Sequence, residues 1–334
     1  MPSSYKLSEG VYGCVYIPPL MCSRGSSLAA PAPGDRVVSK VQKNTFSKAE
    51  LDLVEKIRQL PLASHYFLLP EPSICHLNAS EKNMLKQTCE VAKDLPFERM
   101  TQIQIPYGGQ SMRSAKINFK TFSFKRYMTH FLEGLTLLKK NNYVHADLHM
   151  GNVLMSDAGL PMLIDFAKLT SFGETSETIF KTRFLAFETG HEQIPPECLL
   201  IAGLHLTPKT AEQIIDVIPN MIDISYLSAN FLNYSREEQQ QDLREFLRRF
   251  KQENPTNFLD LATFWHTTSP KFDVYSAGVI FLKLLRNFLR SPYFTERQYS
   301  IGRPATEKVI RGLISFNPYT RLSPEEALKI LSNP

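Results

Sequence analysis

The spacing of hydrophobic positions changes about a third of the way along the chain. Segments 10–17 and 35–43 are rich in β-branched residues and are bounded by turn residues, which predicts short strands. Segment 46–60 instead repeats leucine, valine and isoleucine every three or four positions, the spacing of one helix face. We therefore expect the N-terminal part to form a small β-rich lobe around one helix.

Beyond about residue 121 the pattern is typical of helices. Segment 124–140 carries an apolar stripe, and segment 273–289 is almost entirely apolar, as expected of a buried helix. Ser323 is followed three residues later by Glu326, the pattern of a capping box, which predicts the start of a helix.

The two patterns together predict an α+β fold with two lobes. We expect a small lobe over residues 1–108 that ends in a hinge at "IPYGG", and a larger helical lobe over residues 109–334. A chain of 334 residues is long enough for two lobes with well-buried cores.

Composition narrows the class of protein. Hydrophobic residues make up 43% and charged residues 21%, the values of a soluble globular protein. The net charge of +5 is spread along the chain, which does not favour a nucleic-acid partner. No apolar run approaches the roughly 20 residues of a membrane span, and the N-terminus does not resemble a signal peptide. We expect a soluble, intracellular protein.

The five cysteines are scattered and include no CxxC pair. An odd number without a framework spacing indicates reduced thiols in a cytosol-like compartment. A zinc site is not favoured, because its ligands usually come in closely spaced pairs.

The first candidate for chemistry is a glycine pair followed by a lysine. Gly10 and Gly13 in "LSEGVYGCVY" would let backbone N–H groups approach phosphate oxygens, although a plain hairpin turn also explains them. Lys40 in the next predicted strand could reach the same phosphates, and Glu50 on the following helix could hold its ammonium group. Glu55 is the rival partner, but Glu50 has the better apolar flanks. Ordinary solvated side chains remain the alternative.

A second candidate is "YVHADLHMGN", residues 143–152. Asp147 and Asn152 stand five apart on a predicted loop, and Asp165 ends a short β-rich run. Two carboxylates and an amide suit Mg²⁺, and one carboxylate could instead accept a hydroxyl proton. His145 and His149 are four apart, but a loop does not place them on one face as a helix would, so the spacing does not favour a metal site.

The order of these motifs resembles that of the protein kinase superfamily. Ser8 to Val15 resembles the glycine loop, "VVSK" the VAIK strand, "HADLHMGN" the catalytic loop and "DFA" the DFG motif. Three later motifs also resemble it: "IPPE" at 194–197, "DVYSAG" at 273–278 and "NPYTRL" at 317–322. The resemblance covers about 5–334 and implies that Arg321 pairs with Glu197.

A narrower resemblance is to Ser/Thr kinases encoded by large DNA viruses. It rests on "GVYGCVYIPPLMC", "VSKV", "AELDLVEKI" and "IPYGG". If it holds, the protein would work in the host cytoplasm or in the virion.

The resemblance implies transfer of the ATP γ-phosphate to Ser/Thr hydroxyls of protein substrates. Gly10, Gly13 and Val15 would cover the nucleotide, and the hinge residues Pro106 and Tyr107 would bind adenine. The resemblance also implies that Lys40 binds the phosphates and that Glu50 orients Lys40. Asp147 would accept the proton of the hydroxyl, and Asn152 and Asp165 would bind Mg²⁺ (or Mn²⁺).

Two other functions stay open. Aminoglycoside- and choline-type kinases share HxDxxxxN and often read HxDLHxGN, but they generally lack the three later motifs. A catalytically inactive kinase-like scaffold is the other alternative, against which the complete Lys/Asp/Asn/Asp set argues.

Three of the departures from the kinase pattern bear on regulation, specificity and partners. Ala146 replaces the HRD arginine, which makes activation by loop phosphorylation less expected. His149 replaces the lysine that Ser/Thr kinases place two after the catalytic aspartate, which weakens the Ser/Thr assignment. Glu197 and Asp273 are 76 positions apart, far more than usual, and this insert, about 199–270, is either a packed helical elaboration or a docking surface for a partner.

Overall fold

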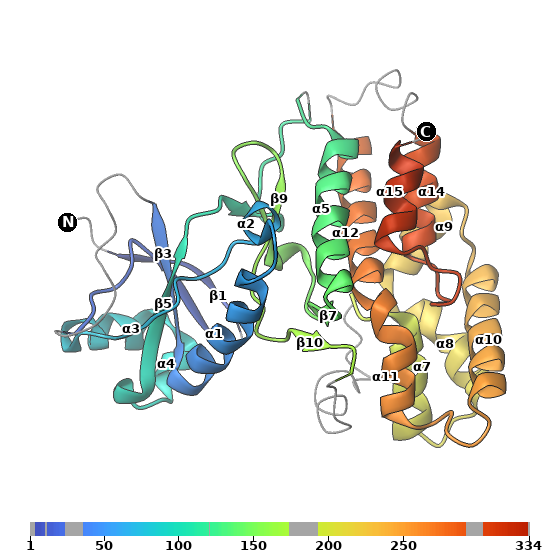
Figure 1. Cartoon of the computed structure of the whole chain (residues 1–334), viewed down its shortest axis with the longest axis horizontal. Helices are drawn as coiled ribbons and strands as arrows, with labels where there is room; N and C mark the ends of the chain where they lie inside the picture. The colour runs from blue at the N-terminus through green and yellow to red at the C-terminus, as the bar shows by residue number, and fades with distance from the viewer. Residues whose placement is uncertain are drawn as a thin grey trace. The chain divides into compact units, whose positions relative to one another are not determined.

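The computed structural model describes residues 4–10, 12–23, 36–119, 121–173, 193–291 and 303–332. The chain divides into two compact units. Unit 1 comprises Met1–Gln110 and Met162–Ala167, and unit 2 comprises Ser111–Pro161 and Lys168–Pro334. Unit 1 holds a small antiparallel sheet and unit 2 is mainly helical, so the expected α+β class is confirmed (Figure 1).

Unit 1 is built around a five-stranded antiparallel sheet with the order β1-β2-β3-β5-β4. Its elements, which include the predicted strands and helix, are β1 (Tyr5–Glu9), β2 (Gly13–Ile17), β3 (Val37–Lys43), α1 (Asn44–Arg58), α2 (Ala63–Tyr66), β4 (Ile74–His76), α3 (Lys82–Thr88), α4 (Glu90–Lys93) and β5 (Met100–Pro106). Two 3₁₀ turns, Ala79–Glu81 and Phe97–Arg99, lie between them.

The alternation of side chains divides the sheet into two faces. Cys14, Tyr16 and Val41 are fully buried on one face, in a cluster with Leu85 of α3 and Ala92 of α4. The residues that alternate with these along the strands point to the other face of the sheet. The helices α3 and α4 therefore cover one side of the sheet and leave the other side for α1.

A short later segment, Met162–Ala167, also belongs to unit 1. Its Leu163 carbonyl accepts a hydrogen bond from the Leu68 N–H at 3.0 Å, and the Phe166 and Phe67 rings meet edge to face at 5.4 Å. The expected division into continuous stretches before and after residue 108 did not anticipate this return of the chain. The strands β6 (Gln110–Ser111) and β9 (Pro161–Leu163) mark the passages from one unit to the other.

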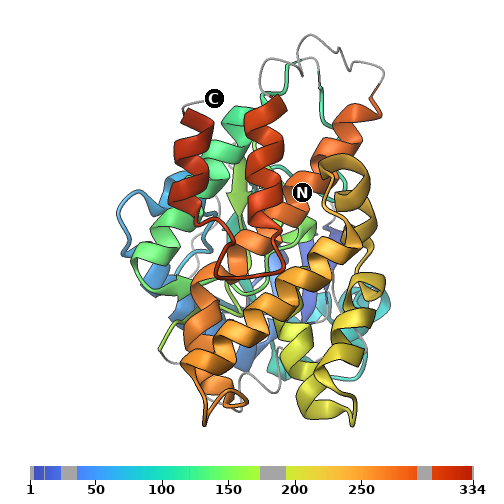
Figure 2. The same ribbon diagram turned by 90° about the vertical axis from the view of Figure 1, so that its right-hand side faces the viewer.

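Unit 2 is built from helices with short strands at its start. Its elements are α5 (Phe124–Lys140), β7 (Tyr143–Val144), β8 (Val153–Met155), β10 (Thr170–Ser171), α7 (Pro196–Leu206), α8 (Ala211–Met221), α9 (Asp223–Leu232), α10 (Arg236–Glu253), α11 (Leu261–Thr268), α12 (Phe272–Leu289), α14 (Arg303–Leu313) and α15 (Pro324–Ser332). The 3₁₀ turns are Met150–Asn152 and Ser269–Lys271. The predicted helices over 124–140 and 273–289 are confirmed, and α14 packs between α12 and α15 (Figure 2).

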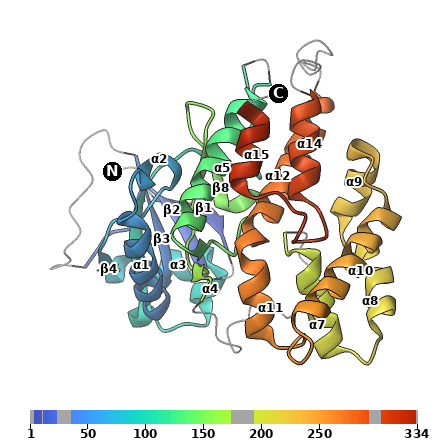
Figure 3. The same cartoon turned by 45° about the vertical axis from the view of Figure 1, so that its right-hand side comes forward.

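The long interval after Glu197 forms helices α7 to α11, with α8 beside both α7 and α10 (Figure 3). The expected apolar face of α10 is buried, including Phe246 and Phe250. Tyr234, just before α10, donates to Asp242 at 2.5 Å and accepts from the Phe316 N–H at 2.9 Å. The bond with Phe316 ties the insert to the rest of unit 2, which favours the packed elaboration over a free docking surface.

The pair that the kinase resemblance implies, Arg321 and Glu197, is present inside unit 2. Both guanidinium NH groups donate to the carboxylate at 2.7 Å, and both side chains are fully buried. The Arg321 Nε donates to the Ser315 carbonyl at 2.9 Å. The capping box at α15 is also confirmed, since the Ser323 N–H donates to Glu326 at 2.7 Å. No helix among the described stretches is both long and apolar enough to cross a bilayer.

The expectation of reduced thiols is wrong for four of the five cysteines. Cys14 is bonded to Cys89, and Cys22 to Cys75, while Cys198 is free and buried. The partners lie 75 and 53 residues apart, and the sheet brings them together, so local spacing could not reveal them. The argument for a cytosol-like compartment from the thiols therefore loses its basis.

We expect the two disulfides to stabilise unit 1. Replacing Cys14 and Cys89 together by alanine should lower the free energy of unfolding by roughly 2–5 kcal/mol, because the cross-link restricts a long loop of the unfolded chain. Urea unfolding of the wild type and of the variant measures this difference, and a reductant added to the wild type should also lower its midpoint. A variant without all four paired cysteines is the control, since reductant should not change its midpoint. An unchanged wild-type midpoint in reductant would contradict the assignment.

Candidate functional site

A buried lysine in unit 1 bridges two carboxylates. The Lys40 Nζ donates to both Glu50 oxygens at 3.0 and 2.9 Å, and to Asp165 Oδ1 at 3.0 Å. Glu50 is buried and the Lys40 side chain is only 12% exposed, whereas Asp165 keeps 30% of its side chain exposed. Three predicted site residues from distant parts of the sequence therefore meet at one ammonium group.

The helix α1 selects Glu50 as the partner of Lys40. Glu50 lies on the buried face of this helix together with Val54 and Ile57. The Gln42 side chain donates to Glu50 at 2.7 Å and holds the carboxylate in place. Glu55, the rival, is on the exposed side of α1 and pairs with Arg58 instead.

The two carboxylates keep Lys40 charged. Burial by itself lowers the pKa of the Lys40 ammonium, but the charges of Asp165 and Glu50 outweigh it and raise the pKa above its ordinary value. Because the pKa is raised, the stabilisation by the ion pairs is fully present below the ordinary lysine pKa. It is lost only when the pH rises through the raised pKa of Lys40. Lys40 is therefore a fixed positive charge at every physiological pH.

The two glycines of the predicted phosphate loop differ in what requires them. A Cβ on Gly13 would meet the Val41 carbonyl oxygen at 2.2 Å, so glycine is needed there for β2 to lie against β3. A Cβ on Gly10 would meet only the Gly13 carbonyl oxygen, at 3.9 Å. Packing thus explains Gly13, while the Gly10 N–H donates to the Gly13 carbonyl at 2.9 Å, as in a plain hairpin turn.

The remaining predicted nucleotide residues of unit 1 lie on the sheet. Val15 is paired directly with Lys40, which puts the two side chains on one face. Pro106 ends β5, and the Tyr107 N–H donates to the Arg36 carbonyl at 2.7 Å. Gly109 has a φ of 102°, a conformation that favours glycine and gives the predicted hinge its turn.

In unit 2 the loop after β7 forms a second cluster around Asp147. The Asn152 side chain donates to the Asp147 carbonyl at 2.9 Å and to its carboxylate at 3.4 Å. The Lys168 Nζ forms an ion pair with Asp147 Oδ1 at 2.8 Å. The two predicted residues therefore lie together, and Lys168, which the motifs did not single out, joins them.

Asp273 at the start of α12 fixes the backbone of this loop. Its carboxylate accepts from the His145 N–H at 2.6 Å and from the Ala146 N–H at 3.0 Å. Burial raises the pKa of Asp273, while the nearby His145 and the two N–H groups oppose that rise. Ala146 has a φ of 62°, which is unusual for a residue with a side chain and indicates a held, strained conformation. The "DVYSAG" motif thus holds the backbone of the loop that carries Asp147.

The two histidines of the loop support its shape. His145 is fully buried. The His149 Nδ1 accepts the Gly151 N–H at 2.9 Å, which caps the turn Met150–Asn152, and a Cβ on Gly151 would meet the ring at 2.7–2.8 Å. His149 therefore serves the backbone of the loop, and Gly151 leaves room for it.

The donor chemistry of two predicted residues fits Mg²⁺. The Asn152 amide nitrogen donates to Asp147, so its oxygen is the atom that can bind a cation, and Asp165 offers a partly exposed carboxylate. Among the described residues, one group of three potential ligands is clustered, Glu9 with Cys14 and Cys89. The two cysteines are joined in a disulfide, so this group is not a metal site.

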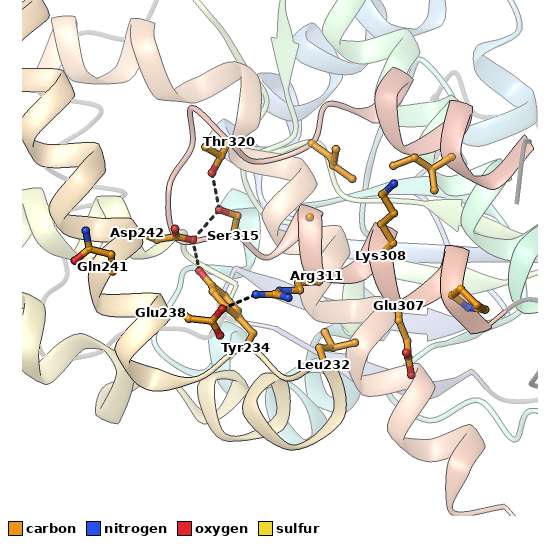
Figure 4. A pocket seen from close by; sticks show the side chains of 14 residues that line it. Leu232, Tyr234, Glu238, Gln241, Asp242, Glu307, Lys308, Arg311, Ser315 and Thr320 are labelled. Carbon is orange, nitrogen blue, oxygen red and sulfur yellow. Dashed lines mark hydrogen bonds and ion pairs between the residues drawn. The ribbon is translucent and has the colours of Figure 1, made fainter.

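A cavity of about 650 Å³ in unit 2 is a separate feature (Figure 4). It lies between α10 and α14, and several of its polar side chains are bonded to one another. Arg311 donates to Glu238 at 2.8 Å, and Asp242 accepts from Ser315 at 3.1 Å. None of the predicted site residues lines it, so it does not belong to the candidate site.

No family model matches the chain, and no curated protein matches it. The residues themselves therefore carry the functional argument.

The Lys40 cluster generates a stability prediction. Glu50→Gln should lower the free energy of unfolding of unit 1 by about 3 kcal/mol, because it weakens a buried ion pair. Glu55→Gln is the matched control on the same helix, and the loss of its exposed pair with Arg58 should change stability by less than about 1 kcal/mol. Urea unfolding at neutral pH measures both. Equal effects would show that Lys40 and Glu50 do not form a buried pair.

Proposed function

We propose that the chain is a protein kinase with a two-lobed kinase-like fold, which transfers the γ-phosphate of ATP to Ser/Thr hydroxyls of protein substrates. The observation that carries the proposal is the Lys40 ammonium, buried in unit 1 and held by Glu50 and Asp165. A charged, oriented donor of this kind suits phosphate oxygens.

The three N–H donors of Lys40 define how it can bind phosphate. Two of them are directed at Glu50 and one at Asp165. A phosphate oxygen must therefore replace one of these partners, and Asp165, the more exposed carboxylate, is the one that can be released. Glu50 then keeps the ammonium oriented toward the ligand.

Mg²⁺ bound to Asp165 would neutralise charge on the phosphates. A phosphate oxygen that replaces Asp165 at Lys40 would release this carboxylate, which would make it available as a ligand.

Asp147 is the residue that would position the substrate hydroxyl and accept its proton. Asn152 and Lys168 fix its carboxylate, and Asp273 fixes the loop that carries it. The catalytic contribution of the protein is then mainly positioning and charge stabilisation.

The pair Arg321 and Glu197 favours a protein over a small molecule as the substrate. Small-molecule kinases with a similar loop generally lack the motifs that supply these two residues, and here the pair is fully buried and bidentate. A small-molecule phosphotransferase and an inactive scaffold remain the competing functions, and each gives a different outcome in one assay.

The test is transfer from γ-labelled ATP with Mg²⁺ to generic protein substrates. Wild type should label Ser and Thr residues, and Asp147→Asn should lower kcat by at least about 100-fold, because it removes the proton acceptor. The unfolding midpoint of the variant, measured in parallel, controls for folding.

Equal labelling by wild type and Asp147→Asn would contradict the mechanism. Label found on a small molecule and not on protein would support the small-molecule phosphotransferase. Binding of ATP with no transfer by the wild type would support the scaffold.

A further inference from the structure

We propose that Lys168 is the positioning residue of the catalytic loop, and that its ammonium orients Asp147 and compensates its charge. The proposal rests on the proposed function, since it assigns a role within the same phosphoryl transfer. It concerns contacts inside unit 2 alone.

A short antiparallel ladder places Lys168 beside Asp147. β7 ends at Val144 just before the loop, and β10 begins at Thr170, which is paired with Val144. Lys168 stands two residues before Thr170 and Asp147 three residues after Val144, so the ladder brings both segments to the same end. The ion pair at 2.8 Å follows from this placement.

Two further contacts anchor this ladder. The Phe172 N–H donates to the Asn142 carbonyl at 2.9 Å, and the Trp265 indole reaches the Ser171 carbonyl at 3.5 Å. Asp273 holds the other side of the loop through the His145 N–H. The backbones that carry Lys168 and Asp147 are thus fixed from both sides.

His149, the residue where Ser/Thr kinases place a lysine, does not supply this charge. Its Nδ1 accepts a hydrogen bond from the Gly151 N–H, so this nitrogen carries no proton and the ring is committed to the turn. Among the ion pairs of the described residues, Lys168 provides the one that engages Asp147. The positive charge next to the proton acceptor comes from the segment after "DFA".

The geometry divides the Asp147 carboxylate into two halves. Oδ1 is bonded to Lys168 at 2.8 Å, while among the described residues Oδ2 has one long contact, of 3.4 Å with Asn152. Lys168 thus holds one oxygen, and the other would accept the proton of the substrate hydroxyl. Without Lys168 the Asp147 carboxylate should rotate more freely. This should lower kcat more than it weakens nucleotide binding.

The test uses Lys168→Met, with Lys139→Met as the matched control. Lys139 forms an ion pair with Glu325 in the same unit, also at 2.8 Å, and is 29% exposed against 31% for Lys168. Lys168→Met should lower kcat by about 100-fold and change the KM for ATP by less than about threefold. Lys139→Met should leave both unchanged.

Two more variants separate positioning from a general structural effect. Lys168→Arg keeps the charge and should recover part of the lost kcat. In the Asp147→Asn background, Lys168→Met should cause no further loss, because Lys168 acts through Asp147. For stability, a urea double-mutant cycle should give a coupling energy between Lys168 and Asp147 that is absent between Lys139 and Asp147.

Three results would overturn the proposal. Wild-type kcat in Lys168→Met, with Asp147→Asn inactive, would refute the role of Lys168 and leave the proposed function intact. A higher kcat in Lys168→Met would mean that the ion pair masks Asp147 instead of orienting it. Absence of any transfer dependent on Asp147 in the wild type would refute the proposed function, and the role of Lys168 with it.

Discussion

The arrangement of unit 1 depends on one buried charge, the Lys40 ammonium. A buried ammonium is tolerated only with compensating anions, and two carboxylates provide them. Glu50 comes from the helix that follows β3, but Asp165 has to come from much later in the chain. The return of Met162–Ala167 to unit 1 meets this requirement, and the Phe166 ring packed on Phe67 anchors it.

The loop that carries Asp147 in unit 2 also depends on one buried charged group, the Asp273 carboxylate. Asp147 stands on a turn with strained backbone at Ala146, and such a turn persists only when its surroundings hold it. The buried Asp273 carboxylate binds the N–H groups of the turn, and the β7–β10 ladder lies beside it. The side chains of the candidate site thus stand on backbone that is fixed independently of them, which the positioning of reacting groups would require.

Helix periodicity was sufficient to predict some of these contacts. The apolar flanks of Glu50 identified it over Glu55, because both the pattern and the contact follow from one buried helix face. The disulfides could not be predicted, since only the tertiary fold of unit 1 brings together cysteines 75 and 53 residues apart. Lys168 was missed because its partner is set by the register of a two-residue ladder, which leaves no periodic signal. Gly13 was assigned to phosphate binding, but its contact with β3 also requires glycine.

The central claim is that Lys40 exchanges Asp165 for a phosphate, and calorimetric titration of ATP with and without Mg²⁺ tests it most directly. In the wild type, Mg²⁺ should strengthen ATP binding by about tenfold or more, because it takes over the released carboxylate. Asp165→Asn should bind metal-free ATP at least as tightly as the wild type does, with little further gain from Mg²⁺. A variant that retains the full Mg²⁺ dependence, or that loses metal-free binding, would contradict the account.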